Sequence, residues 1–153
     1  MNDFISSELY QKIHNYLPIV CVDVVIKTPD NGFLMVKRKE EPAKGEWWLV
    51  GGRVFKNESL ESAARRKIKE EIGVVTEKAE KIIEGYELIF KKDPYGHGNG
   101  THTIATCFIS VINNTENLKL DNFHSEFKVF KHYDKIWRSY LKECLHQAGF
   151  TPK

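Results

Sequence analysis

The sequence contains few cysteines and almost no net charge, and each scarcity excludes a class of protein. Its three cysteines are an odd number and form no C-x-x-C pair, which argues against a disulfide framework or a zinc knuckle and favours a reducing cytoplasm. The 23 basic and 21 acidic residues leave a formal charge of only +2. Proteins that bind nucleic-acid polymers or anionic membranes are usually strongly basic, so neither partner is expected.

A long hydrophobic run is also missing. The most apolar stretch, Leu17 to Ile26, is too short to cross a membrane and contains Pro18 and Asp23. Residues 1–4 lack the basic and apolar regions of a signal peptide, so a cytoplasmic protein without a leader is expected. With 153 residues, 41% of them apolar and 29% charged, the chain is expected to form one globular domain over residues 1–153.

Turn signals and apolar spacing predict the order of the secondary-structure elements. Strands are expected over residues 19–26, 33–39, 82–90, 103–111 and 127–130. Helices are expected over residues 6–16, 60–72 and 133–148. The turn at Pro29–Gly32 should join the first two strands into a hairpin. This order predicts an α+β fold, arranged as an α/β/α sandwich around a mixed sheet.

The segment from Gly52 to Val74 carries the strongest functional signal, and its helix is expected to begin after Ser59 and end at Gly73. On a helical wheel, one apolar arc is formed by Leu60, Ala64, Ile68 and Ile72. Glu71 falls inside this arc, where a carboxylate is costly unless it is paired or binds a metal ion. Glu70 projects beyond the edge of the arc.

The adjacent carboxylates of Glu70 and Glu71 have two interpretations. Two carboxylates at the end of a helix, near the backbone oxygens of Gly51, would suit a hard divalent cation. Alternatively the helix is only salt-bridged, because each carboxylate has a basic residue four positions earlier, Arg66 or Lys67. The same segment holds six basic and four acidic residues, which accounts for the whole charge of +2 and indicates a local anion site.

This segment, GRVFKNESLESAARRKIKEEIGV, resembles the Nudix box, a loop–helix–loop that ends in the pattern R-E-U-x-E-E-x-G-U, where U is aliphatic. The matching residues are Gly52, Glu58, Arg66, Ile68, Glu70, Glu71, Gly73 and Val74. The resemblance implies a Nudix-type sandwich and a hydrolase that holds Mg²⁺ or Mn²⁺ through Gly51, Glu70 and Glu71. Lys67 stands where the family has its first helix glutamate, so we expect one bound ion rather than a cluster.

Other segments are similar to one branch of this family, the GDP-mannose mannosyl hydrolases. The residues that carry the likeness are Asp23, Lys37–Arg38, Pro42–Trp48, Gly51–Val54, Thr101–His102 and His124. Members of this branch hydrolyse a GDP-sugar at the bond between C1 and oxygen, giving GDP and a free hexose. The resemblance implies a nucleotide-sugar substrate, GDP-mannose or GDP-glucose, and makes a homodimer an expectation. One position differs from this branch. Where the branch has a polar residue that helps to hold the metal ion, this chain has Phe123, so Glu70 or Glu126 would have to take over that role.

The resemblance also implies roles for individual residues. His124 would act as a general base on the attacking water, for which the ordinary pKa of histidine is suitable. Arg38 and Arg53, together with the metal ion, would neutralise the departing diphosphate. Asp23 would orient Arg38 or the sugar. Further contacts with the substrate are expected from His102 and Trp47.

These residues have purely structural interpretations as well. Asp23 interrupts an apolar strand and could be a buried acid paired with Arg38, while His124 could be a solvated loop histidine. His102 could simply be exposed at the edge of a strand. The glycine-rich loop over residues 91–100 is either a mobile lid or an ordinary hairpin loop.

Two other functions remain open. A Nudix pyrophosphohydrolase would cleave P–O bonds in a nucleoside triphosphate or another nucleoside diphosphate derivative. It would need a carboxylate such as that of Glu126 to replace the one lost at Lys67. A metal-free nucleotide-binding sensor would be indicated if Lys67 occupied the metal site through Glu71.

Overall fold

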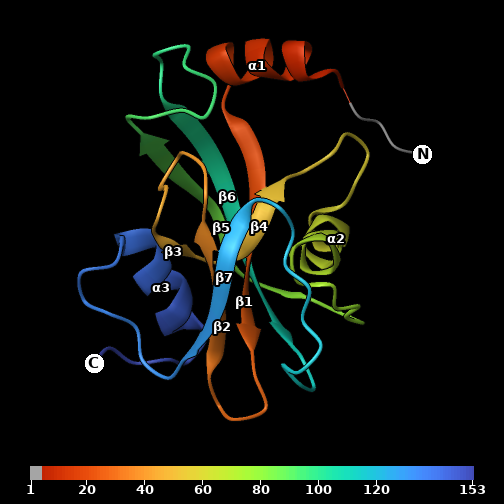
Figure 1. The fold of residues 1–153 in the computed structure, drawn as a ribbon, viewed down its shortest axis with the longest axis vertical. Helices are drawn as coiled ribbons and strands as arrows, with labels where there is room; N and C mark the ends of the chain where they lie inside the picture. Colours follow the sequence, from red (N-terminus) through yellow and green to blue (C-terminus); the bar gives the residue numbers. More distant parts are fainter. Residues whose placement is uncertain (1–4) are drawn as a thin grey trace.

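The computed structural model describes residues 5–153, which form three helices and a seven-stranded sheet (Figure 1). In chain order the elements are α1 (Ser7–Tyr16), β1 (Ile19–Lys27), β2 (Phe33–Arg38), β3 (Trp47–Trp48), β4 (Val50–Arg53), α2 (Leu60–Ile72), β5 (Glu80–Phe90), β6 (Thr101–Val111), β7 (His124–Phe130) and α3 (Ser139–Gln147). Residues 1–4, on which the expectation of no leader rests, lie outside the described residues. Within residues 5–153, no helix is long and apolar enough to cross a membrane.

The sheet is mixed, as expected. Its strands run in the order β3-β2-β1-β6-β5, with β4 paired to β1 and β7 paired to β2. β1 pairs with β6 in parallel, whereas its pairings with β2 and β4 are antiparallel. β6 pairs with β1 along its whole length. β2 and β4 both pair with the opposite edge of β1, β4 beside residues 21–24 and β2 beside Ile26–Lys27.

Hydrophobic cores fill both sides of the sheet, which confirms the predicted sandwich. α2 covers one face through Ala63, Ala64, Ile68 and Ile72. α3 covers the other face through Tyr140, Leu141, Cys144 and Leu145, and Figure 1 shows the two helices on opposite sides of the sheet. Side chains alternate along β1, so Val22 and Val24 pack with α2 while Val25 packs with α3. Asp23 therefore points to the α3 side.

α2 begins and ends where the sequence predicts. The Oγ of Ser59 accepts a hydrogen bond from the backbone N–H of Ser62 at 3.1 Å. Gly73 ends the helix in the left-handed conformation, with a φ of 75°. Glu71 lies on the buried face and is only 3% exposed, whereas the side chain of Glu70 is 42% exposed. The helical-wheel expectation for these two carboxylates is confirmed.

Two elements near the C-terminus differ from the expectation. α3 begins at Ser139 and not at residue 133. The Oδ1 of Asp134 accepts the backbone N–H of Ile136 at 3.0 Å, and this side-chain bond forms a turn in place of the first helical residues. β7 begins at His124 and not at residue 127, because His124 pairs with Arg38 of β2 beyond a shift in register.

Candidate functional site

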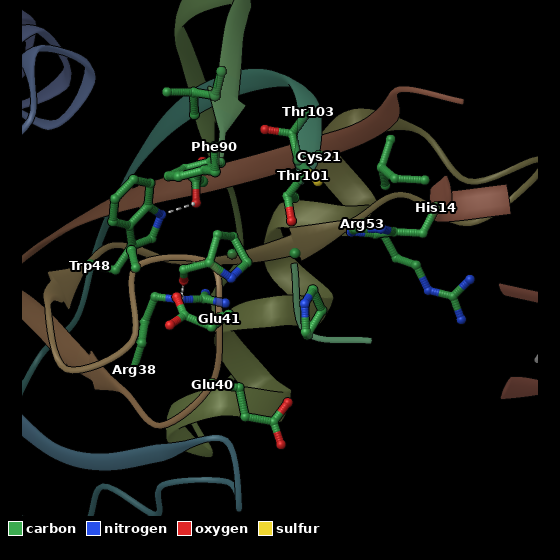
Figure 2. Close-up of a pocket in the computed structure, with 18 of the residues that line it drawn as sticks. His14, Cys21, Arg38, Glu40, Glu41, Trp48, Arg53, Phe90, Thr101 and Thr103 are labelled. Carbon is green, nitrogen blue, oxygen red and sulfur yellow. Dashed lines mark hydrogen bonds between the residues drawn. The ribbon is translucent and has the colours of Figure 1, made fainter. Parts of the chain in front are cut away.

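A pocket of about 230 Å³ opens beside the N-terminal half of β1. It is lined by several strands, by α1 and by two loops, with contributions from Asp23, Arg38, Trp48, Gly51 and Arg53. In Figure 2, Arg38, Glu41 and Trp48 lie at one end of the pocket, and His14 and Arg53 lie at the other. Carboxylates, guanidinium groups and aromatic rings therefore face the same space.

Asp23 is the buried acid of this pocket. Only 6% of the residue is exposed, and its carboxylate accepts hydrogen bonds from Trp48 Nε1 at 3.3 Å and from the hydroxyl of Tyr140 at 2.8 Å. Burial raises the pKa of Asp23 to about 6, although both hydrogen bonds and the charge of Arg38 lower it. At neutral pH the carboxylate is therefore largely ionised, and it faces the pocket at a cost in stability.

Arg38 lies near Asp23 but does not form an ion pair with it in the part of the chain that the structure describes. Its Nε donates to the backbone carbonyl of Pro42 at 2.6 Å. Structural pairing with Arg38 therefore does not explain the burial of Asp23. The remaining N–H groups of Arg38 are available to oxygen atoms of a ligand.

Two glycines let β4 pass between the pocket and α2. A Cβ atom on Gly51 would lie 2.2 Å from the carbonyl oxygen of Val22 and 2.4 Å from Asp23 Oδ1. On Gly52 it would meet the end of the Lys67 side chain at 2.7 Å. The backbone N–H of Gly51 donates to Glu71 Oε2 at 3.3 Å, so β4 links the pocket directly to the end of α2.

The carboxylate of Glu71 is buried between a lysine and a histidine. Lys67 Nζ lies 3.2 Å from Glu71 Oε1, and His124 Nε2 lies 3.8 Å from Glu71 Oε2. Burial raises the pKa of Glu71 to about 7, although Lys67 and His124 lower it. Lys67 thus covers one oxygen of this carboxylate, while the other oxygen faces Gly51 and His124.

His124 is held by a neighbouring carboxylate. Its Nδ1 lies 2.7 Å from Asp121 Oδ1, which also accepts the backbone N–H of Phe123 at 3.0 Å. Burial tends to raise the pKa of Asp121, but the hydrogen bond with His124 outweighs it and the pKa lies below its ordinary value. An ionised Asp121 fixes the proton on Nδ1, which leaves Nε2 as an acceptor facing Glu71.

Glu71, Asp121 and His124 together fit a divalent cation. Each offers one ligand atom, and the three atoms lie within 4.8 Å of one another. The two carboxylates suit Mg²⁺ or Mn²⁺, and the imidazole nitrogen is more readily accepted by Mn²⁺. Gly51 adjoins this group through its bond to Glu71. The donor types and their spacing therefore make this group a candidate metal site.

Glu70, the other carboxylate of the pair, is turned away from this group. Both of its oxygens accept hydrogen bonds from Arg66 at 3.1 Å, and Lys67 Nζ lies 3.2 Å from one of them. Arg66 also binds Glu58 at 2.6 Å, so it links Glu70 in the last turn of α2 to Glu58, which precedes the helix. In this arrangement Glu70 neutralises basic side chains.

Two residues expected at the substrate do not line the pocket. Trp47 packs edge-on against Phe130 with 5.4 Å between the ring centroids, and the adjacent Trp48 lines the pocket instead. His102 lies 3.8 Å from Glu87 Oε1, while its neighbours Thr101 and Thr103 line the pocket. Alternation along a strand explains both cases, because adjacent side chains point to opposite faces.

The structure adds residues that the sequence patterns did not indicate. Asp121 precedes Phe123 by two positions, the spacing of an Asx turn, and this is the local signal that could have drawn attention to it. Tyr140 is 117 positions away from Asp23, so no local pattern links them. Tyr10 lines the pocket from α1, where the sequence showed only an amphipathic helix.

The chain is similar in sequence to known proteins. A family model described as the NUDIX domain matches residues 17–148. The low-salt glycan biosynthesis protein Agl8 of Haloferax volcanii is 38% identical over 128 residues, which cover 83% of this chain and 80% of that protein. An ADP-ribose pyrophosphatase of Methanocaldococcus jannaschii is 41% identical over 88 residues, which cover 57% of this chain and 50% of that protein.

Solved structures share the fold. The MutT NUDIX hydrolase from Burkholderia pseudomallei superimposes with a TM-score of 0.68 at 26% identity, covering 85% of this chain and 97% of that one. An Ap4A hydrolase of C. elegans has a TM-score of 0.65 at 19% identity, covering 85% and 94%, and this likeness concerns the fold alone.

Proposed function

The chain belongs to the Nudix family, whose model spans residues 17–148, and from this premise we propose that it is a metal-dependent hydrolase of a nucleotide-sugar. The substrate is a GDP-hexose such as GDP-mannose or GDP-glucose. Water attacks the sugar C1, and the products are GDP and a free hexose. Support for a sugar-containing substrate comes from the likeness to the GDP-mannose mannosyl hydrolases and from a relative named for glycan biosynthesis.

The observation that carries this proposal is the hydrogen-bonded pair of Asp121 and His124 beside Glu71. Nδ1 and Oδ1 are 2.7 Å apart, and Nε2 is directed at the metal-binding carboxylate. An imidazole oriented by a carboxylate is the usual form of a general base that works near neutral pH. A water molecule that attacks the sugar carbon needs such a base. Lys67 also replaces one of the carboxylates with which the family usually binds several metal ions.

The proposed roles lie on the two sides of β4. His124 Nε2 accepts a proton from the attacking water, and Asp121 stabilises the imidazolium that results. Arg53 and Arg38 neutralise the negative charge that develops on the departing diphosphate. Asp23, which is mostly ionised at neutral pH, accepts hydrogen bonds from sugar hydroxyls. Glu71 and the carbonyl of Gly51 would hold a divalent cation, which would supply further positive charge beside the diphosphate. In this proposal the Nε2 of His124 takes the proton and does not bind the ion.

Hydrolysis of GDP-mannose in ¹⁸O-labelled water tests this proposal. We expect the label in the hexose and none in GDP, with activity dependent on Mg²⁺ or Mn²⁺. A panel containing GDP-glucose, ADP-ribose and nucleoside triphosphates would define the substrate. Label in the nucleotide product would overturn attack at the sugar carbon.

A pyrophosphohydrolase that cleaves P–O bonds is the second candidate, and Asp121 favours it. Glu126, which was expected to supply the extra carboxylate, is on the surface and pairs with Lys37 at 3.2 Å. Asp121 supplies a second carboxylate beside Glu71 instead. The relationship to an ADP-ribose pyrophosphatase also supports this candidate. Release of a nucleoside monophosphate from a nucleoside diphosphate derivative would identify it.

The contact between Lys67 and Glu71 favours a third candidate, a metal-free nucleotide-binding sensor. The ammonium group lies 3.2 Å from one oxygen of Glu71 and could take the place of a cation. Calorimetric titration with Mg²⁺ and Mn²⁺ separates this candidate from the other two. Absence of metal binding, with nucleotide affinity unaffected by Glu71→Gln, would identify the sensor.

The proposal includes the setting in which the protein acts. Its three cysteines are free thiols, in keeping with the reducing cytoplasm expected for this chain. The partner is a small nucleotide-sugar and not a nucleic-acid polymer or a membrane. The resemblance also carries the expectation of a homodimer, which sedimentation equilibrium would test.

A further inference from the structure

Helix α1 is fastened over the pocket by its polar and aromatic side chains. Its one buried residue is His14, and the remainder of the helix is partly or fully exposed. His14 Nδ1 lies 2.8 Å from His97 Nε2, and Asn15 Oδ1 accepts a hydrogen bond from Asn99. Figure 1 shows α1 lying across the end of the molecule beside the loop that contains these partners. The helix is therefore held at the mouth of the pocket and not by a hydrophobic core.

The loop that holds α1 is itself built by side-chain hydrogen bonds. The carboxylate of Asp93 accepts the backbone N–H groups of Tyr95, His97 and Gly98 at 2.9–3.1 Å. The N–H of Asn99 donates to His97 Nδ1 at 3.1 Å, so His97 carries its proton on Nε2 and donates it to His14. The loop is thus a defined support for α1, because side chains within the loop accept four of its backbone N–H groups.

Tyr10 of α1 contacts the guanidinium group of Arg53. The Cζ of Arg53 lies 4.2 Å from the centroid of the Tyr10 ring and 5.1 Å from that of Phe55. The Cζ of Arg66 lies 3.8 Å from the centroid of the same Phe55 ring. Contacts between rings and guanidinium groups therefore connect α1 to α2, and Arg53 contacts two rings.

The edges of the Arg53 guanidinium are available to a ligand. Arg53 lines the pocket, and its backbone carbonyl accepts a hydrogen bond from Arg66 Nη2 at 2.9 Å. Among the residues that the structure describes, none forms an ion pair or a hydrogen bond with its guanidinium group. Tyr10 and Phe55 contact this guanidinium group, while residues 5–153 leave its N–H groups without a hydrogen bond. This is the state in which a guanidinium group binds two oxygens of a phosphate at once.

We propose that Tyr10 is a positioning residue, which holds the Arg53 guanidinium in the plane that binds the diphosphate of the substrate. α1 is then part of the substrate site, and the bond between His14 and His97 keeps it there. The inference rests on the proposed function only in taking a diphosphate as the group that Arg53 binds. It does not depend on the base, on the sugar or on which bond is cleaved.

A double-mutant cycle on the full chain tests this coupling, with inorganic pyrophosphate and Mg²⁺ as the probe in calorimetry. Tyr10→Leu keeps the apolar bulk but removes the ring, and should weaken pyrophosphate binding by about fivefold. Tyr10→Phe should bind like the unaltered protein. Arg53→Gln should weaken binding by more than tenfold, about the loss of one bidentate contact. Tyr10→Leu added to Arg53→Gln should then have no further effect.

Tyr16→Leu is the matched control, because Tyr16 lies on the same helix and is 78% exposed. It should leave pyrophosphate affinity unchanged, and thermal unfolding of every variant reports whether the fold is intact. The inference would be overturned if Tyr10→Leu lowered pyrophosphate affinity equally in the presence and absence of Arg53. Unchanged affinity in Tyr10→Leu would also overturn it, and so would a failure of the unaltered protein to bind pyrophosphate. If GDP-mannose is not hydrolysed but the coupling is found, only the proposed function fails.

Discussion

Replacing Asp23 with asparagine should stabilise the folded protein at neutral pH while lowering its activity. Burial raises the pKa of Asp23 from 3.8 to about 6, so the folded protein binds this proton more tightly than the unfolded chain. A shift of about two units corresponds to about 3 kcal/mol. The unaltered protein therefore loses about this much stability between about pH 4 and pH 7, since above the raised pKa the buried carboxylate is charged.

Asparagine removes this charge and keeps the shape. Its amide oxygen can accept the hydrogen bond from Trp48, and its amide nitrogen can donate to the hydroxyl oxygen of Tyr140. Relative to the unaltered protein, the unfolding free energy of Asp23→Asn should therefore rise by about 3 kcal/mol between about pH 4 and about pH 7. The changed hydrogen bonds cancel in this comparison, because they are present at both pH values.

Urea unfolding of both proteins without metal ions, followed by tryptophan fluorescence, measures this difference. Asp30→Asn is a control of opposite sign, because hydrogen bonds from Lys131 and Thr28 lower the pKa of Asp30 to about 2. The unfolding free energy of that variant should fall relative to the unaltered protein as the pH rises from about 2 to about 4, since the variant gives up an acid that favours the folded state when ionised. If the difference for Asp23→Asn is the same at every pH, Asp23 does not titrate as the structure requires.

Three other predictions concern the groups around Glu71 and β4. His124→Gln should lower kcat by about 100-fold or more with little change in KM. His146→Gln, on the surface of α3, should have no effect on either constant. A change in KM alone for His124→Gln would make His124 a binding residue and not the general base. Lys67→Glu should allow a second Mn²⁺ ion to bind, because it removes an ammonium group that repels a cation. A metal titration that gives the same stoichiometry for Lys67→Glu and the unaltered protein would contradict this repulsion. Gly51→Ala should lower the melting temperature sharply, because its methyl group would meet a backbone oxygen of β1 at 2.2 Å, whereas Gly52→Ala meets only the flexible end of a lysine at 2.7 Å. Equal melting temperatures for the two glycine variants would show that β4 adjusts freely.

The local parts of the site could be predicted from the sequence because helical periodicity is a local property. Leu60, Ala64, Ile68 and Ile72 define the buried face of α2 by spacing alone, and Glu71 is found on that face, 3% exposed. The direction of Glu70 followed from the same wheel. Periodicity does not identify partners, however, so Lys67 and His124 as neighbours of Glu71 had to come from the fold.

The pocket depends on contacts between distant parts of the chain, which local patterns do not contain. Asp23 receives its hydrogen bonds from β3 and from α3, and the second donor is Tyr140. The two tryptophans show a limit of another kind. Alternation along a strand directs Trp47 and Trp48 to opposite faces, but which face contains the pocket depends on how β3 pairs with β2.

Two departures from the family pattern act on the same step. Lys67 places an ammonium group 3.2 Å from a carboxylate that would otherwise be free for metal ions, so the positive charge that a second ion would bring is already fixed in the chain. A fixed ammonium cannot activate water as a metal ion does, and another base is then required. Asp121 and His124 supply one at 2.7 Å from each other and beside Glu71. Under the proposed function, the loss of a metal-binding carboxylate and the presence of an oriented imidazole are two parts of one change, from attack at phosphorus to attack at carbon.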